Sequence, residues 1–149
     1  MQLKYKITDP KCEDFLALVR ELNVTLDAIT ADTGEGSFAR DEFCPRTDGC
    51  IVVYAQDKAI ACGIFRKHQD DSCELKRMFS KVKGAGSYLV SQLESYALQK
   101  GYKRAVLSTR RVNELAINFY TRQGYSEIKA YGKYVHTDRS ICLGKALTL

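Results

Sequence analysis

Hydrophobic and polar residues alternate over residues 2–8, which is the period of a half-buried strand. Asp9 and Pro10 end this pattern, and hydrophobic residues then recur at helical spacing up to Leu22. Asp9 can cap a helix and Pro10 suits its first turn, so the pattern predicts an amphipathic helix. Its hydrophobic stripe consists of Phe15, Leu18, Val19 and Leu22.

The middle of the chain carries three apolar runs that are typical of strands. Residues 50–55 and 59–67 are joined through Gln56, Asp57 and Lys58, which predicts an antiparallel hairpin. After the polar residues 68–72, the run "CELKRMF" predicts a further strand. Between Asp27 and Glu42 there is no clear period, so this stretch is expected to be irregular or helical.

Helical and strand-like patterns alternate in the second half of the chain. A helical face over residues 89–97 ends near Gly101, and "RAVLST" predicts a strand. Asn113 can cap the next helix, which Gly124 can end, and Val112 and Ile117 can staple its first turn. The runs "SEIKA" and "SICLGKAL" predict the last two strands.

This order predicts an α/β (α+β) protein with a mixed, mostly antiparallel central sheet of about seven strands and helices on both faces. The 149 residues, 45% of them hydrophobic, are expected to form a single domain over residues 1–149. The polar first residues and the short apolar runs favour a soluble, cytoplasmic protein without membrane spans.

Charge and cysteine content exclude two classes of partner. The net charge of +5 suits an anionic ligand but is spread too evenly to argue for nucleic acid. Six cysteines occur without a C-x-x-C pair and only two histidines could join them, so we expect free thiols and no metal site.

The stretch "SKVKGAGSYLV" places glycines and lysines directly before a helix. Helix N-termini present unpaired N–H groups, and glycine lets backbone approach an oxyanion, so residues 81–87 are a candidate anion site. The same residues also suit an ordinary turn with solvated lysines. The dinucleotide-binding fingerprint is excluded because Leu89 stands where it needs a small residue. The nucleotide-triphosphate loop is excluded because no Gly-Lys-Ser/Thr sequence occurs.

The spacing Lys81-x-x-Gly84-x-Gly86 after "ELKRMF" resembles the coenzyme A loop of the GNAT superfamily of N-acyltransferases. The segment "NELAINFYTRQGY" and the closing "YGKYVHTDRSICLGKAL" resemble the family as well, so the similarity runs from Cys73 to Leu147. Lys81 departs from the Arg or Gln that is usual in the family, and the connection from Met78 to Lys81 is short.

The resemblance implies acetyl-CoA as cosubstrate, without a metal. Strands four and five would splay, with pantetheine along strand four and the pyrophosphate on N–H groups from Val82 to Ser87. The residues so implied to contact the coenzyme are Met78, Ser80, Lys81, Val82, Lys83, Gly84, Ala85, Gly86, Ser87, Asn113 and Tyr120. Asn113 also fits an ordinary helix cap.

Two residues match catalytic positions of the family. Tyr120 would protonate the leaving thiolate, and the alternative is a tyrosine of the helix core. Glu74 would accept the amine proton, directly or through water, and the alternative is a solvated or ion-paired strand residue. At strand period Glu74 shares a face with Lys76 and Met78, and the N–H of Met78 is the implied oxyanion donor.

The acceptor is expected to be a primary amine of a small molecule, peptide or protein. Carboxylates between Asp27 and Glu42 would attract a cationic amine, and the loop with Tyr131, Tyr134 and His136 would border its pocket by resemblance. A catalytically silent acyl-CoA-binding regulatory module is the alternative function. The oligomeric state is left open as monomer or homodimer.

Overall fold

The computed structural model describes residues 2–31 and 42–148. Their elements, in chain order, are β1 (Leu3–Thr8), α1 (Glu13–Thr30), β2 (Gly49–Ala55), β3 (Lys58–Gln69), β4 (Ser72–Ser80), α2 (Ala85–Gln99), β5 (Arg104–Arg110), α3 (Glu114–Arg122), β6 (Ser126–Glu127), the 3-10 helix η3 (Gly132–His136) and β7 (Ser140–Ala146).

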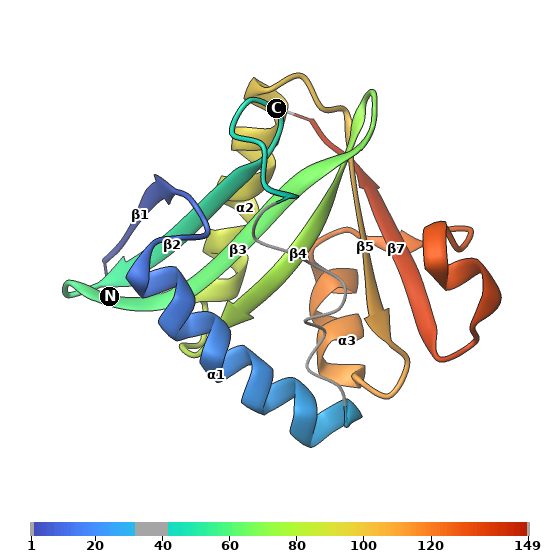
Figure 1. The fold of residues 1–149 in the computed structure, drawn as a ribbon, viewed down its shortest axis with the longest axis horizontal. Coiled ribbons are helices and arrows are strands. Elements are labelled where there is room, and N and C mark those ends of the chain that lie inside the picture. The colour runs from blue at the N-terminus through green and yellow to red at the C-terminus, as the bar shows by residue number, and fades with distance from the viewer. Residues whose placement is uncertain (1, 32–41, 149) are drawn as a thin grey trace.

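The strands form one open sheet in the order β1-β2-β3-β4-β5-β7-β6. Every neighbouring pair is antiparallel except β4 and β5, which are parallel. Helix α1 lies across one face of the sheet and α2 covers the other (Figure 1). The predicted mixed, mostly antiparallel sheet with helices on both faces is confirmed.

The sequence of strand β2 is a nearly continuous apolar run because the strand is buried on both faces of the sheet. Cys50 and Val52 pack with Phe15 and Leu18 of α1. The alternate residues of β2 join a larger cluster built on α2. A strand with a helix on each side needs apolar residues at every position, as in "CIVVYA".

Several turns and helix ends have the structure that the sequence predicts. Gln56 and Asp57 both have positive φ, 52° and 65°, which is the geometry of a tight hairpin turn between β2 and β3. The Asn113 Oδ1 accepts the Ala116 N–H at 3.3 Å and caps α3. Gly101 and Gly124, with φ of 99° and 96°, follow the ends of α2 and α3.

Other expectations were wrong in detail. Cys12, not Asp9, is the N-cap residue of α1, since the Asp9 carboxylate accepts the Lys11 N–H at 2.7 Å in the preceding turn. Strand β1 forms the sheet edge, so Tyr5 and Ile7 are exposed instead of half-buried. The strand predicted at "SEIKA" is reduced to the two residues of β6, and the 3-10 helix η3 follows it. Helix α1 extends to Thr30, within the stretch that was predicted to be irregular or helical.

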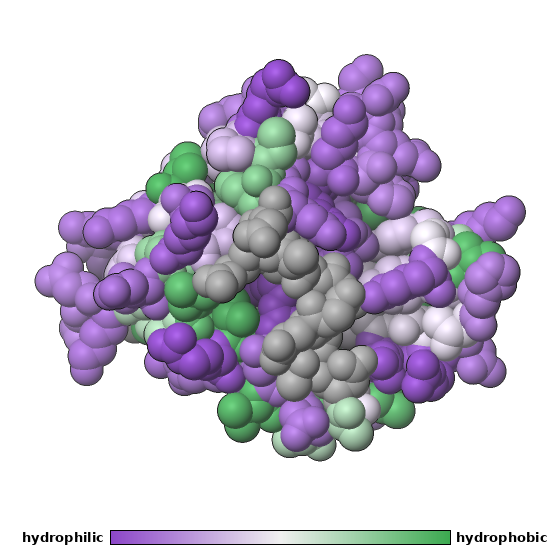
Figure 2. Space-filling model, in the orientation of Figure 1, coloured by the Kyte–Doolittle hydropathy of each residue, from purple (hydrophilic) through white to green (hydrophobic). Residues whose placement is uncertain are grey.

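The six cysteines are free, and Cys50, Cys62, Cys73 and Cys142 are buried. Within residues 2–31 and 42–148, no helix combines the length and apolar character that a membrane crossing requires. The face toward the viewer in Figure 2 is mostly hydrophilic, and its hydrophobic residues lie in separate patches.

Strand β4 contains a β-bulge at Arg77. Its register with β3 shifts opposite Gly63, and Arg77 at the shift has a φ of 54°. This bulge turns the Arg77 guanidinium toward α1, where it donates a hydrogen bond to Asn23. The pairing of β4 with β5 runs only to Glu74 and Val106, and beyond this point the two strands diverge (Figure 1).

Candidate functional site

The divergence of β4 and β5 encloses a cavity of about 180 Å³, which we call the strand-gap cavity. Leu75 and Met78 of β4 and Leu107 of β5 line it, and Tyr120 of α3 contributes to the same lining. Its lining combines apolar side chains with polar ones, and its two strands carry backbone groups that do not pair with each other beyond Glu74 and Val106. It therefore suits an extended chain that offers amide groups to a strand.

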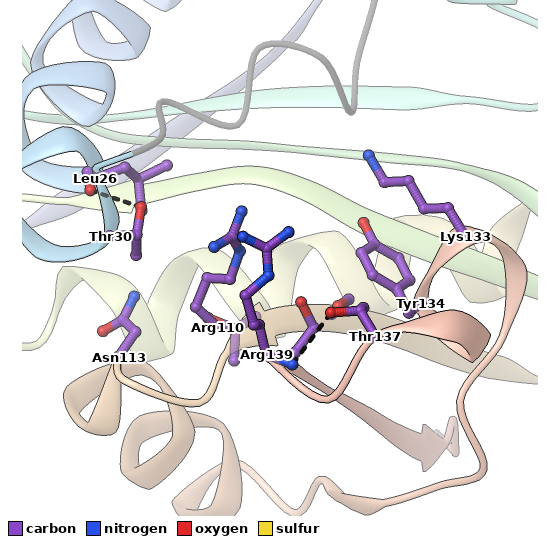
Figure 3. Close-up of a pocket in the computed structure, with 11 residues that line it drawn as sticks. Leu26, Thr30, Arg110, Asn113, Lys133, Tyr134, Thr137 and Arg139 are labelled. Carbon is purple, nitrogen blue, oxygen red and sulfur yellow. Dashed lines mark hydrogen bonds between the residues drawn. The ribbon is translucent and has the colours of Figure 1, made fainter.

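A second cavity of about 410 Å³, the outer cavity, adjoins the strand-gap cavity. The two share the lining residues Leu26, Ser108, Thr109, Asn113 and Tyr134. Figure 3 shows the outer cavity between the end of α1, the end of β5 and the segment from η3 to β7. A ligand in one cavity can therefore contact a ligand in the other.

The glycine loop forms the N-terminus of α2. Gly84 has a φ of 89°, in the left-handed region that favours glycine, and no atom lies within 4 Å of where its Cβ would be. The Ala85 N–H donates to the Val82 carbonyl at 3.1 Å. The N–H groups of Lys83, Gly84, Gly86 and Ser87 meet no acceptor within the described part of the chain. The loop therefore presents several donors at the positive end of a helix dipole.

The two lysines of the loop lie in different surroundings. The Lys81 ammonium pairs with Glu21 of α1 at 3.1 Å, and the Lys81 N–H donates to the Ile60 carbonyl at 3.0 Å. Lys83 is exposed beside Gly84. Ser80 donates its hydroxyl to the Val82 carbonyl at 3.1 Å, which stabilises the turn into the loop. Lys81 is therefore directed toward α1, and the backbone supplies the loop's donors.

Tyr120 is both a core residue and a residue of the cavity. Its side chain is 8% exposed, and its ring packs edge-on against Phe119 and Tyr125. Burial raises the pKa of Tyr120, so the phenol keeps its proton at neutral pH. The ring packing holds a proton donor at the wall of the strand-gap cavity.

Glu74 is buried and has several partners. Its carboxylate accepts the Tyr131 hydroxyl at 2.7 Å and lies 3.5 Å from the Lys76 ammonium and 3.6 Å from Arg66 Nε. It lines a third cavity, of about 320 Å³, and is absent from the described linings of the other two. These contacts match the alternative interpretation of Glu74 as an ion-paired residue of the strand.

The bulge in β4 changes which side chains share a face. Lys76 follows the strand period and lies on the α1 side with Glu74, where its ammonium also donates to the Tyr134 hydroxyl at 3.4 Å. Met78 instead packs with the α2-side cluster, close to Gly63 and Leu93. The expectation that Met78 shares a face with Glu74 was therefore wrong, because Arg77 occupies the extra position.

Sequence reasoning missed the basic side chains of the outer cavity. Arg110 ends β5 and Arg139 precedes β7, and the pairing of Arg110 with Ser140 brings them to one wall. Predicting this proximity requires knowing that the strands predicted at 104–109 and 140–147 are neighbours. Of the acidic stretch, residues 32–41 lie outside the described residues, and Glu42 pairs with Arg66 at 2.9 Å.

Comparison with known proteins identifies the family. The family model described as "Acetyltransferase (GNAT) family" matches residues 19–125, which is more than half of the chain. The chain belongs to this family. A probable N-acetyltransferase 14 from Xenopus tropicalis is 34% identical to this GNAT chain over 80 residues. That match covers 50% of the chain and only 39% of the relative.

Solved structures share the GNAT fold at low identity. A putative acyl-CoA N-acyltransferase from Klebsiella pneumoniae has a TM-score of 0.84 at 22% identity, with 99% of each chain covered. The PaiA N-acetyltransferase from Thermoplasma acidophilum, solved with coenzyme A, has a TM-score of 0.75 at 16% identity. This match covers 98% of the present chain and 99% of the other.

The contact between Tyr131 and Glu74 predicts a pH-dependent stability. Burial, together with the Glu74 carboxylate, raises the pKa of Tyr131 above its ordinary value near 10. The stabilising contact is fully present below about pH 10 and is lost as the pH rises toward the folded-state pKa. We expect Tyr131→Phe to lower the free energy of unfolding by about 1 to 3 kcal/mol at neutral pH.

Denaturant unfolding of both proteins from neutral pH to about pH 11 measures this difference, which should shrink above about pH 10. Tyr5→Phe on the sheet edge, at an exposed ring, is the control and should leave stability nearly unchanged. A constant difference between wild type and Tyr131→Phe across the whole range would contradict the assignment.

Proposed function

We propose that this chain is an N-acetyltransferase that moves an acetyl group from acetyl-CoA to a primary amine by direct attack, acting as a single domain. The observation that carries the proposal is the strand-gap cavity, one wall of which is β4, the strand that leads along the chain into the glycine loop at the N-terminus of α2. Membership of the GNAT family and the coenzyme A bound to the PaiA structure support it.

In this proposal pantetheine lies along the edge of β4 that does not pair with β5, near Met78 and Ser80. The pyrophosphate accepts hydrogen bonds from N–H groups between Val82 and Ser87, with Lys83 as a nearby cation. Lys81 acts by its position at the start of the loop, since its ammonium already pairs with Glu21. Asn113 caps α3 and also lines the cavity, so its amide can meet the coenzyme.

The reaction forms a bond between the amine nitrogen and the acetyl carbonyl carbon and breaks the carbon–sulfur bond. The carbonyl oxygen gains charge in the transition state, and the Met78 N–H is the proposed donor to it. The amine proton leaves toward Glu74 through water, and the departing thiolate takes a proton from Tyr120. The products are an amide and coenzyme A.

A panel of small amines and peptides, assayed for thiol release from acetyl-CoA, tests the activity. The many partners of Glu74 favour one alternative, a module that binds acyl-CoA without turnover. Such a module would bind acetyl-CoA and release no thiol with any amine. Absence of acetyl-CoA binding would contradict both functions.

We expect Gly84→Val to abolish the rise in melting temperature that acetyl-CoA causes in the wild type. A β-branched residue is strained at a φ of 89°, so the loop must move and its N–H groups lose their common direction. Thermal melts with and without acetyl-CoA measure the effect.

Gly101→Val is the matched control, because Gly101 has a similar φ of 99° and equally open space at the other end of α2. It should carry a similar strain and keep the acetyl-CoA response. An acetyl-CoA response in Gly84→Val equal to that of the wild type would remove the loop from the binding site.

We expect Tyr120→Phe to lower turnover by about 100- to 10,000-fold while acetyl-CoA affinity changes little. The substitution keeps the buried ring and removes only the proton donor. The raised pKa of Tyr120 exceeds that of a thiol. Complete transfer of the phenol proton to a ground-state thiolate is therefore unfavourable. Tyr120 is expected to donate its hydrogen bond as negative charge develops on the sulfur in the transition state.

Steady-state kinetics on a validated acceptor, with acetyl-CoA affinity measured separately, provide the test. Tyr125→Phe is the control, since Tyr125 is buried beside Tyr120 but donates to Glu94 of α2 at 2.8 Å and is not among the residues that line the strand-gap cavity. If Tyr120→Phe turns over as fast as the wild type, Tyr120 is a packing residue and not the proton donor.

We expect Glu74→Gln to reduce turnover by about 100-fold at neutral pH and by less at high pH, where the amine is already unprotonated. Gln keeps the shape and can still accept the Tyr131 hydroxyl. Glu94→Gln is the control, because Glu94 also pairs with a lysine and a tyrosine, Lys145 and Tyr125, away from the cavities. An unchanged pH–rate profile would exclude Glu74 from proton transfer.

A further inference from the structure

The outer cavity has a basic wall. Arg110 comes from the end of β5, Arg139 from the residue before β7, and Lys133 from η3. Figure 3 shows the Arg110 and Arg139 side chains next to each other, directed into the same space. No Asp or Glu occurs among the described residues that line this cavity, and its other polar groups are hydroxyls and one amide.

The backbone places the two arginines firmly. Arg110 pairs with Ser140 at the end of the ladder between β5 and β7, and the Arg111 N–H donates to the Arg139 carbonyl at 2.8 Å. The Arg139 N–H donates to the Thr137 hydroxyl at 3.2 Å, as drawn in Figure 3. Two guanidinium groups on one wall can both donate hydrogen bonds to the oxygens of one oxyanion, and such charge-assisted hydrogen bonds are stronger than neutral ones.

The outer cavity, which carries the basic wall, adjoins the strand-gap cavity. The outer cavity and the strand-gap cavity share Ser108, Asn113 and Tyr134, so a group held in the outer cavity lies beside the proposed thioester position. A volume of about 410 Å³ is within the range of small-molecule sites.

We propose that the acceptor is a small amine that also carries an anionic oxyacid group, a carboxylate or a phosphate, which binds to Arg110 and Arg139. This inference rests on the proposed acetyl transfer and names its substrate class. The oxyacid group does not react: it holds the molecule so that its amine points into the strand-gap cavity. Asp27 and Glu42, the described ends of the acidic stretch, do not line the outer cavity.

The test compares amines that differ only in the oxyacid group. Amino acids are paired with their amides, and phosphoethanolamine with ethanolamine, and thiol release from acetyl-CoA is measured for each. Rates are compared per concentration of unprotonated amine, so that differences in amine pKa do not decide the result. We expect the acid of at least one pair to have a kcat/KM at least about tenfold above its neutral partner.

The two kinds of pair distinguish the source of the anion. A preference confined to amino acids identifies a carboxylate, and one confined to phosphoethanolamine identifies a phosphate. We expect Arg139→Gln to reduce the preference by about tenfold to hundredfold, with acetyl-CoA affinity unchanged. Arg122→Gln, which removes an exposed arginine at the end of α3 outside the cavity, should retain the preference.

Equal or better turnover of the neutral partners in every pair would overturn the inference while leaving acetyl transfer intact. Weaker acetyl-CoA binding in Arg139→Gln would also overturn it, because the arginine would then serve the coenzyme. If no amine reacts, the proposed function fails separately. The anion site is then judged by whether inorganic phosphate or glycine raises the melting temperature of the CoA-loaded wild type more than that of Arg139→Gln.

Discussion

The end of the parallel pairing between β4 and β5, at Glu74 and Val106, is the constraint on which the site depends. Both strands continue past this point, β4 to Ser80 and β5 to Arg110, without each other's hydrogen bonds. Backbone groups near a protein interior need partners, so this divergence creates a place for a ligand that can form strand-like hydrogen bonds. Helix α3 and its Tyr120 close one side of the space.

At the point of divergence a buried carboxylate links distant parts of the chain. Burying Glu74 without partners would be costly, and its contacts come from β3, β4 and the segment before η3. Tyr131 and Tyr134 therefore both reach β4, the first through Glu74 and the second through Lys76. Tyr134, which lines both the outer cavity and the strand-gap cavity, is held to β4 by its hydrogen bond with Lys76.

Much of the fold could be predicted because its signals are local. The hairpin at Gln56 and Asp57, the cap at Asn113 and the glycines after α2 and α3 each act within a few residues of chain. The bulge at Arg77 has no such local signal, because it lies opposite Gly63 of the neighbouring strand, where an added Cβ would meet the Met78 sulfur. The partners of Glu74 and the meeting of Arg110 with Arg139 depend on strand order, which periodicity alone does not supply.

The contacts of Glu74 mean that its charge has two separable effects on the proposed reaction. As a carboxylate it can receive a proton through water, an effect that disappears at a pH where the amine is already neutral. It also balances the ammonium of Lys76, which lines the strand-gap cavity and donates to Tyr134. An unbalanced cation there would stabilise negative charge that develops on oxygen or sulfur. The first effect depends on whether the amine is protonated and the second does not, so the shape of a pH–rate profile separates proton transfer from charge balance.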